Sequence, residues 1–381
     1  MREKIRKLPL GLIILTILAL TGFASVICRY LFGLGAVSNM SDGRGWGMWI
    51  GFDLYCGVAL AAGGFTTAAI VYIFGGEKYH SVARPAILTA FLGYLLVILA
   101  LLVDLGEPWY IWHAIIYWNI HSPLFEVAMC VMTYTFVLAL EFSPAVFERL
   151  HWNVPLKIIH AIEIPLIILG ICLSTLHQSS LGSMLLMMPT TLHPIWYTPI
   201  LPILFYFSAL AVGPAMVMFE STITGKSMGH EQNHEVMEGL GKIIPWILGI
   251  YLMLKVGDLL VRGNFGLVFT DFPHNILWWA EMLIGVILPI ILFSIKKFRR
   301  SNTRLFWGAA LVVLGLIINR FNVSLINLQM RPGYTYFPSW VEIATSVGLF
   351  ADAMLVIWLA YKVFPMIKHS QHDSPTALKQ D

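Results

Sequence analysis

The chain has 381 residues, of which 58% are hydrophobic and only 12% are charged, and its formal net charge is +3. Soluble domains average about 25% charged and about 45–50% apolar residues, so this composition excludes an ordinary soluble protein. We expect a chain that lies in a lipid bilayer and has no nucleic-acid partner.

Apolar runs fill most of the chain, and each is close to the roughly 20 residues that a membrane-spanning helix needs. Breaks at Pro144, Pro194, Gly225–Gly229 and Pro332–Gly333 help to separate them. The sequence therefore predicts an all-α polytopic membrane protein with one membrane domain, 1–362, and a polar, disordered tail, 363–381. The predicted spans are 9–31, 49–74, 85–104, 122–141, 157–177, 200–221, 243–261, 275–295, 303–321 and 340–362.

The first apolar run follows the basic segment MREKIRK, as a signal peptide would. The run continues to about Ile27 and no clean A-x-A cleavage site follows it, so we expect a retained membrane anchor.

Lysine and arginine gather on one set of alternate loops. That set holds the basic N-terminal segment and the run from Lys296 to Arg304, whereas the opposite set holds only a few, such as Arg29 and Arg262. Cytoplasmic loops collect Lys and Arg, so we expect both termini to be cytoplasmic. An even number of spans also requires both termini to lie on the same side of the membrane.

The four cysteines lie singly on four different predicted spans, at Cys28, Cys56, Cys130 and Cys172. There is no C-x-x-C or C-x-x-C-H motif, so we expect no iron–sulfur cluster and no covalent haem on this chain. We also expect no metal site. If electrons pass through the protein, their metal carriers belong to partner subunits.

Spans two to five (49–177) and six to nine (200–321) can be superposed as two four-helix bundles, flanked by spans one and ten. Corresponding members carry Asp104 and Asp258 near one end, and Glu126 and Glu281 near the start. Sites in helical membrane proteins often lie in a bundle core or between repeats.

Ionisable residues inside the spans are the strongest functional signal, because a charge in hydrocarbon is costly. The predicted topology gathers one polar group near the outer face: Asp53, Asp104, Glu126 and His177, which Gln178 follows. A second group lies toward the cytoplasm: Arg84, Glu141, Glu163 and Glu220. Tyr94 lies between the two.

Structural roles compete with functional ones at most of these positions. Asp104 and His177 would also suit the membrane interface, and Tyr94 would suit packing. Glu141 and Glu220 could pair with Arg149 or Lys226, and Glu163 with Lys157 or Arg84. Lys255 and Asp258 are spaced to neutralise each other on one helix. The aromatic, lysine-poor outer loops fit either the lipid interface or an extrinsic partner.

These residue types suit the reduction of a quinone. A quinone needs an apolar slot, hydrogen-bonding groups at its carbonyls and a proton donor near each carbonyl. His177 could donate to a carbonyl, and desolvated carboxyl groups such as Asp53 and Glu126 could exchange protons near neutral pH. A tyrosine hydroxyl in mid-membrane, Tyr94, could bridge water chains.

Several strings resemble the NrfD/polysulfide-reductase family of membrane subunits, and within it the membrane subunits of nickel–iron hydrogenases. They are WGMWIGFDLYCG, VARPAILTAFLGYLL, HSPLFEVAMC, ALEFSPAVFERL, LSTLHQSSLGSM and YTYFPSWVEI. The resemblance implies a haem-free, inner-membrane subunit. Such a subunit binds a periplasmic iron–sulfur protein, which passes electrons from a hydrogenase large and small subunit to menaquinone or ubiquinone.

The family pattern places the quinone near the outer face of the first bundle. It implies that His177 and Asp53 lie beside the headgroup, and we add Asp104 and Gln178 as neighbours. It implies proton transfer through Tyr94, Glu126, Glu220 and Arg84, and we add Glu163.

Three alternatives stay open. A di-haem cytochrome b would need facing histidine pairs, whereas His160 and His177 fall on one predicted helix. A secondary transporter would need broken helices at mid-depth in both halves, and Pro165 and Pro214 do not form such a pair. A member of the same family could also serve a polysulfide reductase, a nitrite reductase or an alternative complex III.

Overall fold

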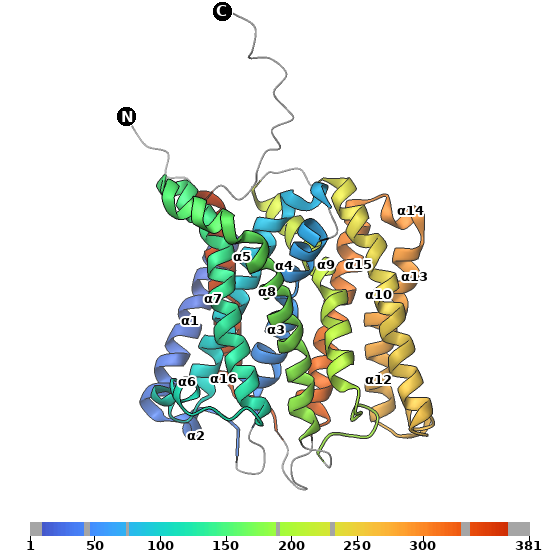
Figure 1. The fold of residues 1–381 in the computed structure, drawn as a ribbon. Helices are drawn as coiled ribbons and strands as arrows, with labels where there is room; N and C mark the ends of the chain where they lie inside the picture. The colour runs from blue at the N-terminus through green and yellow to red at the C-terminus, as the bar shows by residue number, and fades with distance from the viewer. Residues whose placement is uncertain are drawn as a thin grey trace, which may run out of the picture.

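The computed structural model describes residues 10–41, 46–73, 76–187, 191–228, 233–328 and 336–364. In these ranges the chain is mainly helical, and Leu192 and Leu328 form an isolated β bridge. Ten helical segments are long and apolar enough to cross a membrane, which confirms the predicted fold class. The first span begins and the last ends on one side, at the top of Figure 1, which we call the terminus side. The tail predicted to be disordered lies almost wholly outside the described residues.

Three of the ten spans contain π-helical turns. The first span is α1 (Leu10–Phe32). The second span is made of η1 (Trp49–Leu54), α3 (Tyr55–Leu60), α4 (Gly63–Ala68) and η2 (Ala69–Ile73). The next three spans are α5 (His80–Asp104), α7 (Pro123–Leu150) and α8 (Asn153–Leu186). The sixth and seventh spans are α9 (Leu201–Met228) and α10 (His234–Val261). The eighth span is made of α12 (His274–Met282), η5 (Leu283–Ile287) and α13 (Leu288–Ser294). The ninth is α15 (Asn302–Phe321) with η6 (Asn322–Ile326), and the tenth is α16 (Trp340–Val363). Short helices lie between them: α2 (Leu34–Val37), η3 (Glu77–Tyr79), η4 (Pro108–Tyr110), α6 (His113–Ile116), α11 (Leu267–Thr270) and α14 (Lys296–Arg299).

Helices α7 and α8 are longer than predicted. Pro144 was expected to separate two elements, but it lies inside α7, which continues to Leu150 and ends at His151 in the left-handed conformation. A proline removes one hydrogen bond without preventing the helix from continuing when neighbouring helices hold it. At the other end, the Ser122 hydroxyl accepts a hydrogen bond from the Phe125 amide, and Pro123 takes the first position.

The second span is the least regular. It begins with the π-helical segment η1, which contains Asp53, and it breaks at a turn between α3 and α4. Small residues let it approach α5 closely: a Cβ atom on Gly93 would lie 3.0 Å from that of Ala61. Because π-helical turns frequently occur at functional sites, this irregularity draws attention to Asp53.

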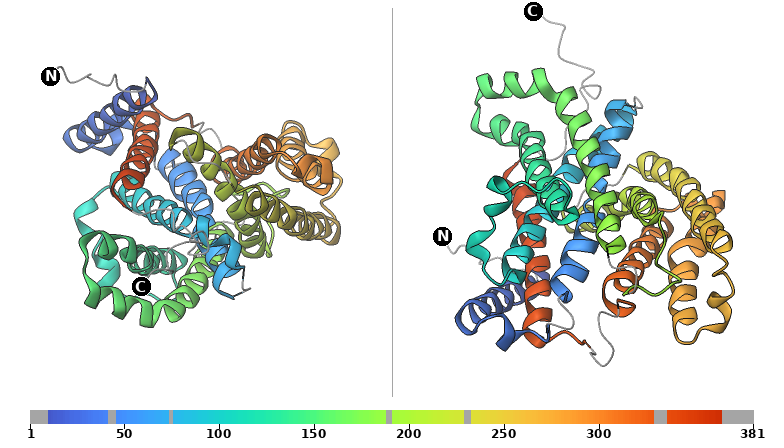
Figure 2. Two further views of the ribbon diagram at one scale, coloured as in Figure 1. Left: turned by 90° about the horizontal axis from the view of Figure 1, so that it is seen from above. Right: turned by 60° about the horizontal axis from the view of Figure 1, so that its bottom comes forward.

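The helices pack around α9. It contacts α8, α3 and α4 on one side and α10 and α15 on the other, and α7 packs extensively along α8 (Figure 2). Helix α1 packs mainly on α16, where Gly22 and Gly348 let the two backbones approach closely, and α16 packs on α5. The division into two four-helix bundles stays an interpretation, because α9 joins both groups.

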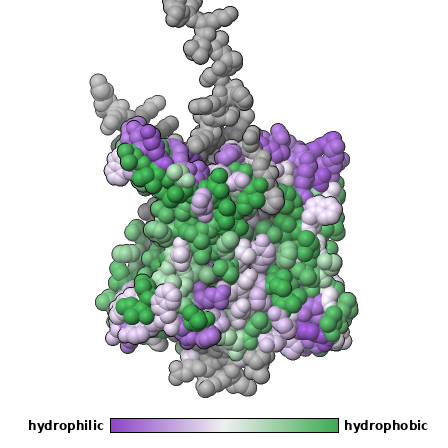
Figure 3. Space-filling model, viewed as in Figure 1, coloured by the Kyte–Doolittle hydropathy of each residue, from purple (hydrophilic) through white to green (hydrophobic). Residues whose placement is uncertain are grey.

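The face of the molecule seen in Figure 3 carries a broad apolar belt between two polar rims. Helix α1 contributes large exposed apolar side chains, among them Leu10, Phe23 and Leu31. Their exposure fits contact with lipid.

Candidate functional site

An apolar cavity of about 280 Å³ lies between η1 and α3, α5, α9 and α16. Its wall is formed mostly by aliphatic and aromatic side chains, including Leu92, Phe219 and Phe350. Two carboxyl groups interrupt this wall, Asp53 from the second span and Glu220 from α9. The cavity therefore offers an apolar volume with an ionisable group from each of two different spans.

Asp53 is held by the last span. The Ser346 hydroxyl of α16 donates to Asp53 Oδ2 at 2.6 Å. Asp104, at the end of α5, lies within electrostatic range of Asp53, and its Oδ1 atom is buried with no hydrogen bond among the described residues. Arg29 is also close, because its Nε and Nη2 atoms donate to the Val103 and Leu105 carbonyls.

Glu220 lies near Thr89 of α5, and both residues line the cavity. The Glu220 side chain is buried, and its Oε1 atom has no hydrogen-bond partner among the described residues. The alternative pairing with Lys226 finds no support, since the Lys226 ammonium is exposed and lies over the Phe306 ring.

A second polar region lies between α5, α7 and α8. The Tyr94 hydroxyl and His177 Nδ1 are 2.8 Å apart, and the Tyr94 ring meets that of Tyr134 edge to face at 4.7 Å. Ser174 lies beside both tyrosines. His177 is fully buried, and its Nε2 atom has no partner in the described structure.

His177 and Gln178 do not line the apolar cavity. The Gln178 amide donates to the Val58 carbonyl of α3 at 2.9 Å, so Gln178 approaches α3 from α8. Asp53 instead contacts α16. The structure thus separates the predicted headgroup residues into two sets, Asp53 with Asp104 and His177 with Gln178.

The polar region continues toward the terminus side through Glu141 of α7. Gly170 of α8 leaves room for this carboxylate, since a Cβ atom there would lie 2.9 Å from Glu141 Oε1. Glu141 interacts electrostatically with Tyr134 in one direction and with Glu163 in the other.

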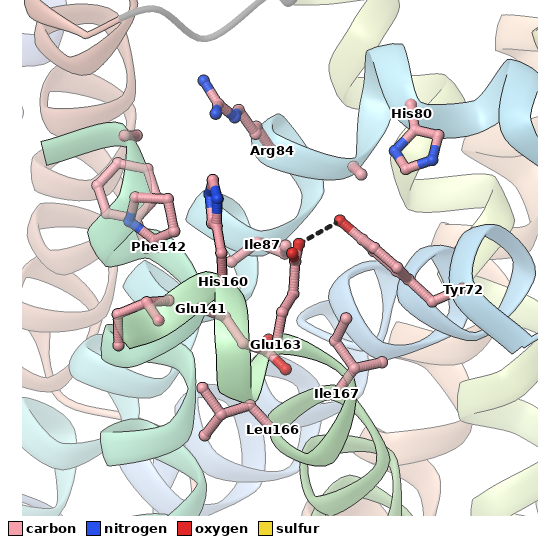
Figure 4. Close-up of a pocket in the computed structure, with 14 residues that line it drawn as sticks. Tyr72, His80, Arg84, Ile87, Glu141, Phe142, His160, Glu163, Leu166 and Ile167 are labelled. Atoms are coloured by element: carbon pink, nitrogen blue, oxygen red, sulfur yellow. Dashed lines mark hydrogen bonds between the residues drawn. The ribbon is translucent and has the colours of Figure 1, made fainter. Parts of the chain in front are cut away.

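Glu141 and Glu163 then face a pocket of about 60 Å³ that is also lined by Arg84, His160 and Tyr72 (Figure 4). Glu163 accepts a hydrogen bond from the Tyr72 hydroxyl at 2.9 Å. Arg84 forms an ion pair with Glu148 at 2.5 Å, a partner that the sequence analysis did not consider.

Glu126 is less enclosed than expected. It lies in the first turn of α7 with an exposed side chain, so the protein itself does not desolvate it. Its Oε1 atom accepts a hydrogen bond from Ser180 at 2.6 Å, and Ser180 is one turn of α8 from His177. Glu126 therefore connects the protein surface with the region around His177.

The prediction that Lys255 and Asp258 neutralise each other is wrong. Lys255 forms a buried ion pair with Glu281, whereas Asp258 pairs with Arg262 at 2.6 Å. Residues three apart on a helix need not meet when a neighbouring helix supplies a better-placed partner. Glu281 also accepts hydrogen bonds from Trp196, Asn319 and Asn322 at 2.9–3.1 Å.

Sequence reasoning missed Tyr134 and Tyr72 and gave no role to Glu148. A signal was present, because Tyr134, Glu141 and Glu148 are spaced by seven residues and so share one face of α7. That spacing on an otherwise apolar helix predicts a polar stripe toward a neighbouring helix.

These features, ten apolar spans with ionisable residues buried between them, accord with the sequence comparisons. The chain belongs to the NrfD family of polysulphide reductases, whose model matches residues 36–333. It is 34% identical over 362 residues to the probable Ni/Fe-hydrogenase 2 b-type cytochrome subunit of Escherichia coli, covering 93% of this chain and 92% of that protein. It is 32% identical over 365 residues to the menaquinone reductase integral membrane subunit of Nitratidesulfovibrio vulgaris, covering 88% and 86%. Another protein of that organism is 41% identical over 357 residues, with 91% of each chain covered.

The name of the Escherichia coli relative refers to a b-type cytochrome, whereas the sequence predicts no haem here. His160 and His177 cannot face each other as an axial pair. His160 and His177 share helix α8, and the Nδ1 atom of His177 is bonded to Tyr94. The absence of haem stays a prediction, which an optical spectrum of the purified protein would test.

Proposed function

We propose that this chain is the quinone-reactive membrane subunit of a hydrogenase complex at the bacterial inner membrane, with both termini in the cytoplasm. Electrons would arrive from an iron–sulfur partner on the periplasmic side, which itself receives them from a nickel–iron hydrogenase small and large subunit. Similarity to the hydrogenase 2 subunit of Escherichia coli supports this choice of partner. Co-purification with a nickel-containing protein would test it, and capture of a nickel-free reductase instead would contradict it.

The apolar cavity supports a quinone substrate, either menaquinone or ubiquinone. Ligand pockets are mostly apolar and carry a few convergent polar groups, as this one does at Asp53 and Glu220. We place the quinone ring near Asp53, where η1 and α16 meet and where Asp104 adds a second carboxyl group.

The polar region between α5, α7 and α8 is the proposed route for protons from the cytoplasm. It contains, in order, Glu163, Glu141, Tyr134, Tyr94 and His177, with Ser174 beside the tyrosines. When Tyr94 donates to His177 Nδ1, the Nε2 atom carries the proton and can donate it onward. His177 would release that proton toward the substrate on the far side of α3, and Gln178 would hold α8 against α3 through its hydrogen bond to the Val58 carbonyl.

The side of the membrane that supplies the protons decides whether quinone reduction moves net charge across the bilayer. Moving one charge across a membrane is worth about 2.3 kcal/mol per 100 mV. If two electrons enter from the periplasm and two protons from the cytoplasm, reduction of one quinone is electrogenic.

Filling the cavity should block the substrate. Ala353 lines it from α16, so we expect Ala353→Trp to raise the KM for a soluble quinone analogue by at least about tenfold, because an indole ring would occupy the space. Steady-state quinone reduction by the purified complex measures this. The matched control is Val356→Trp on the exposed side of the same helix, which should leave KM unchanged. An unchanged KM in both variants would contradict the proposal that the quinone binds in this cavity.

The proposed route also includes Glu126, whose partner Ser180 is one turn of α8 from His177, and this provides a second test. We expect Glu126→Gln to lower quinone-linked turnover by about 10²-fold, because an amide cannot exchange a proton with the Ser180 and His177 region. Turnover with a dye that takes electrons from the hydrogenase partner should survive. Equal loss of both activities would argue that Glu126 has a structural role.

A further inference from the structure

Two loops on the side opposite to the termini bring together three residues that commonly bind metal ions. His193 lies between α8 and α9, and Asp271 and His274 lie where α11 leads into α12. One ligand atom from each lies within 4.8 Å of the other two. His193 Nε2 is 2.8 Å from Asp271 Oδ2, and His274 Nδ1 is 3.6 Å from the same oxygen.

One of the three ligand atoms makes no hydrogen bond in the described structure. His274 Nδ1 is buried and has no hydrogen-bond partner among the described residues. All three side chains are partly exposed, at 16%, 32% and 19% for His193, Asp271 and His274, so an ion could reach them from outside the protein.

We propose that His193, Asp271 and His274 form a binding site for one divalent transition-metal ion, with Zn²⁺ as the best fit. Two imidazole nitrogens and a carboxylate oxygen are a frequent ligand set for zinc, and water would complete a tetrahedral shell. The sequence analysis predicted no metal site, because these ligands come from segments almost eighty positions apart.

Binding has a cost that sets its strength. The imidazole rings of His193 and His274 are stacked, with centroids 3.9 Å apart and planes at 15°. The rings must rotate away from this parallel arrangement before a nitrogen lone pair of each can point at the same ion. His193 Nδ1 also accepts a weak hydrogen bond from the Ile195 amide at 3.3 Å, and this contact is lost when Nδ1 carries the proton. We therefore expect micromolar rather than nanomolar affinity.

A bound ion would tie the two loops together above the buried ion pair of Lys255 and Glu281. The Trp196 ring lies 5.9 Å from that of His193 and 6.5 Å from that of His274, and its indole nitrogen donates to Glu281 at 3.0 Å. Metal binding would thus restrain the loop that covers this pair.

Isothermal titration of the full-length, detergent-solubilised protein with Zn²⁺ tests the proposal, with Co²⁺ absorption reporting on the ligand field. We expect one ion per chain with a micromolar Kd. Loss of an outer hydrogen-bond partner alone weakens metal sites by about 10–100-fold, so His193→Ala and His274→Ala should each weaken binding by at least that range.

The matched control is His121→Ala, an exposed histidine of the loop before α7 on the same side of the protein, which should leave binding unchanged. Asp271→Asn keeps the size of the side chain and should weaken binding without loosening the fold. Circular dichroism and thermal unfolding of each variant show whether it has folded. Failure to bind Zn²⁺ below about 1 mM, or equal binding by the His193, His274 and His121 variants, would overturn the assignment.

Discussion

Replacing Tyr94 with Phe should lower quinone-linked turnover by about 10²-fold or more, because general acid–base groups typically contribute 10²–10⁴-fold. The substitution removes one hydroxyl group and leaves the ring packed against Tyr134. It breaks the 2.8 Å hydrogen bond to His177 Nδ1 and so interrupts the proposed proton route at its deepest point. Single-turnover reduction of a quinone analogue by the purified complex measures the rate.

The control for this variant is Tyr55→Phe. Tyr55 is as deeply buried, and among the described residues its hydroxyl makes a single long hydrogen bond of 3.4 Å, to the Leu181 carbonyl. We expect it to keep most of the activity. If both variants lose activity equally, or if dye-linked turnover in the partner also falls, Tyr94 does not act as a proton carrier.

Replacing Lys255 with Met should destabilise the protein by about 3–5 kcal/mol, because it leaves the carboxylate of Glu281 buried without its counter-charge. Both side chains are almost completely enclosed, at 5% and 2% exposure. Thermal unfolding in detergent measures the loss. The double variant Lys255→Met with Glu281→Gln should recover part of it, because the amide carries no charge and its one oxygen can still accept hydrogen bonds from Trp196 and Asn322.

Lys242→Met provides the matched surface change, since Lys242 pairs with Glu238 at the exposed end of α10. Exposed pairs contribute about 0–1 kcal/mol, so this variant should unfold near the wild-type temperature. Similar unfolding temperatures for Lys255→Met and Lys242→Met would show that the buried pair does not stabilise the second half of the chain.

The number and order of the spans could be predicted because lipid imposes a length and a composition on each helix. The limits of α7 and α8 could not be predicted from the sequence. Both helices extend beyond their apolar runs, with Arg149 near the end of α7 and Lys157 near the start of α8. The hydropathy of the sequence identifies apolar runs, so it does not predict polar helical turns that continue them.

The partners of the ionisable residues were harder to predict. Lys255 was assigned to Asp258 on the same helix, but it meets Glu281 from another helix. Such contacts depend on how each helix is rotated about its axis, which sequence spacing alone does not determine. For the same reason, Asp53 and His177 were expected together, whereas one contacts α16 and the other contacts α5.

Where the quinone binds can be measured most directly by photo-crosslinking a light-activated quinone analogue to the intact complex and mapping the labelled peptides by mass spectrometry. We predict labelling of the segments that line the cavity, from Phe52 to Ala61 and from Phe350 to Ile357, and loss of that labelling in Ala353→Trp. Labelling confined to the lipid-facing surface of α1, unaffected by Ala353→Trp, would contradict the proposal that this chain binds quinone between its helices.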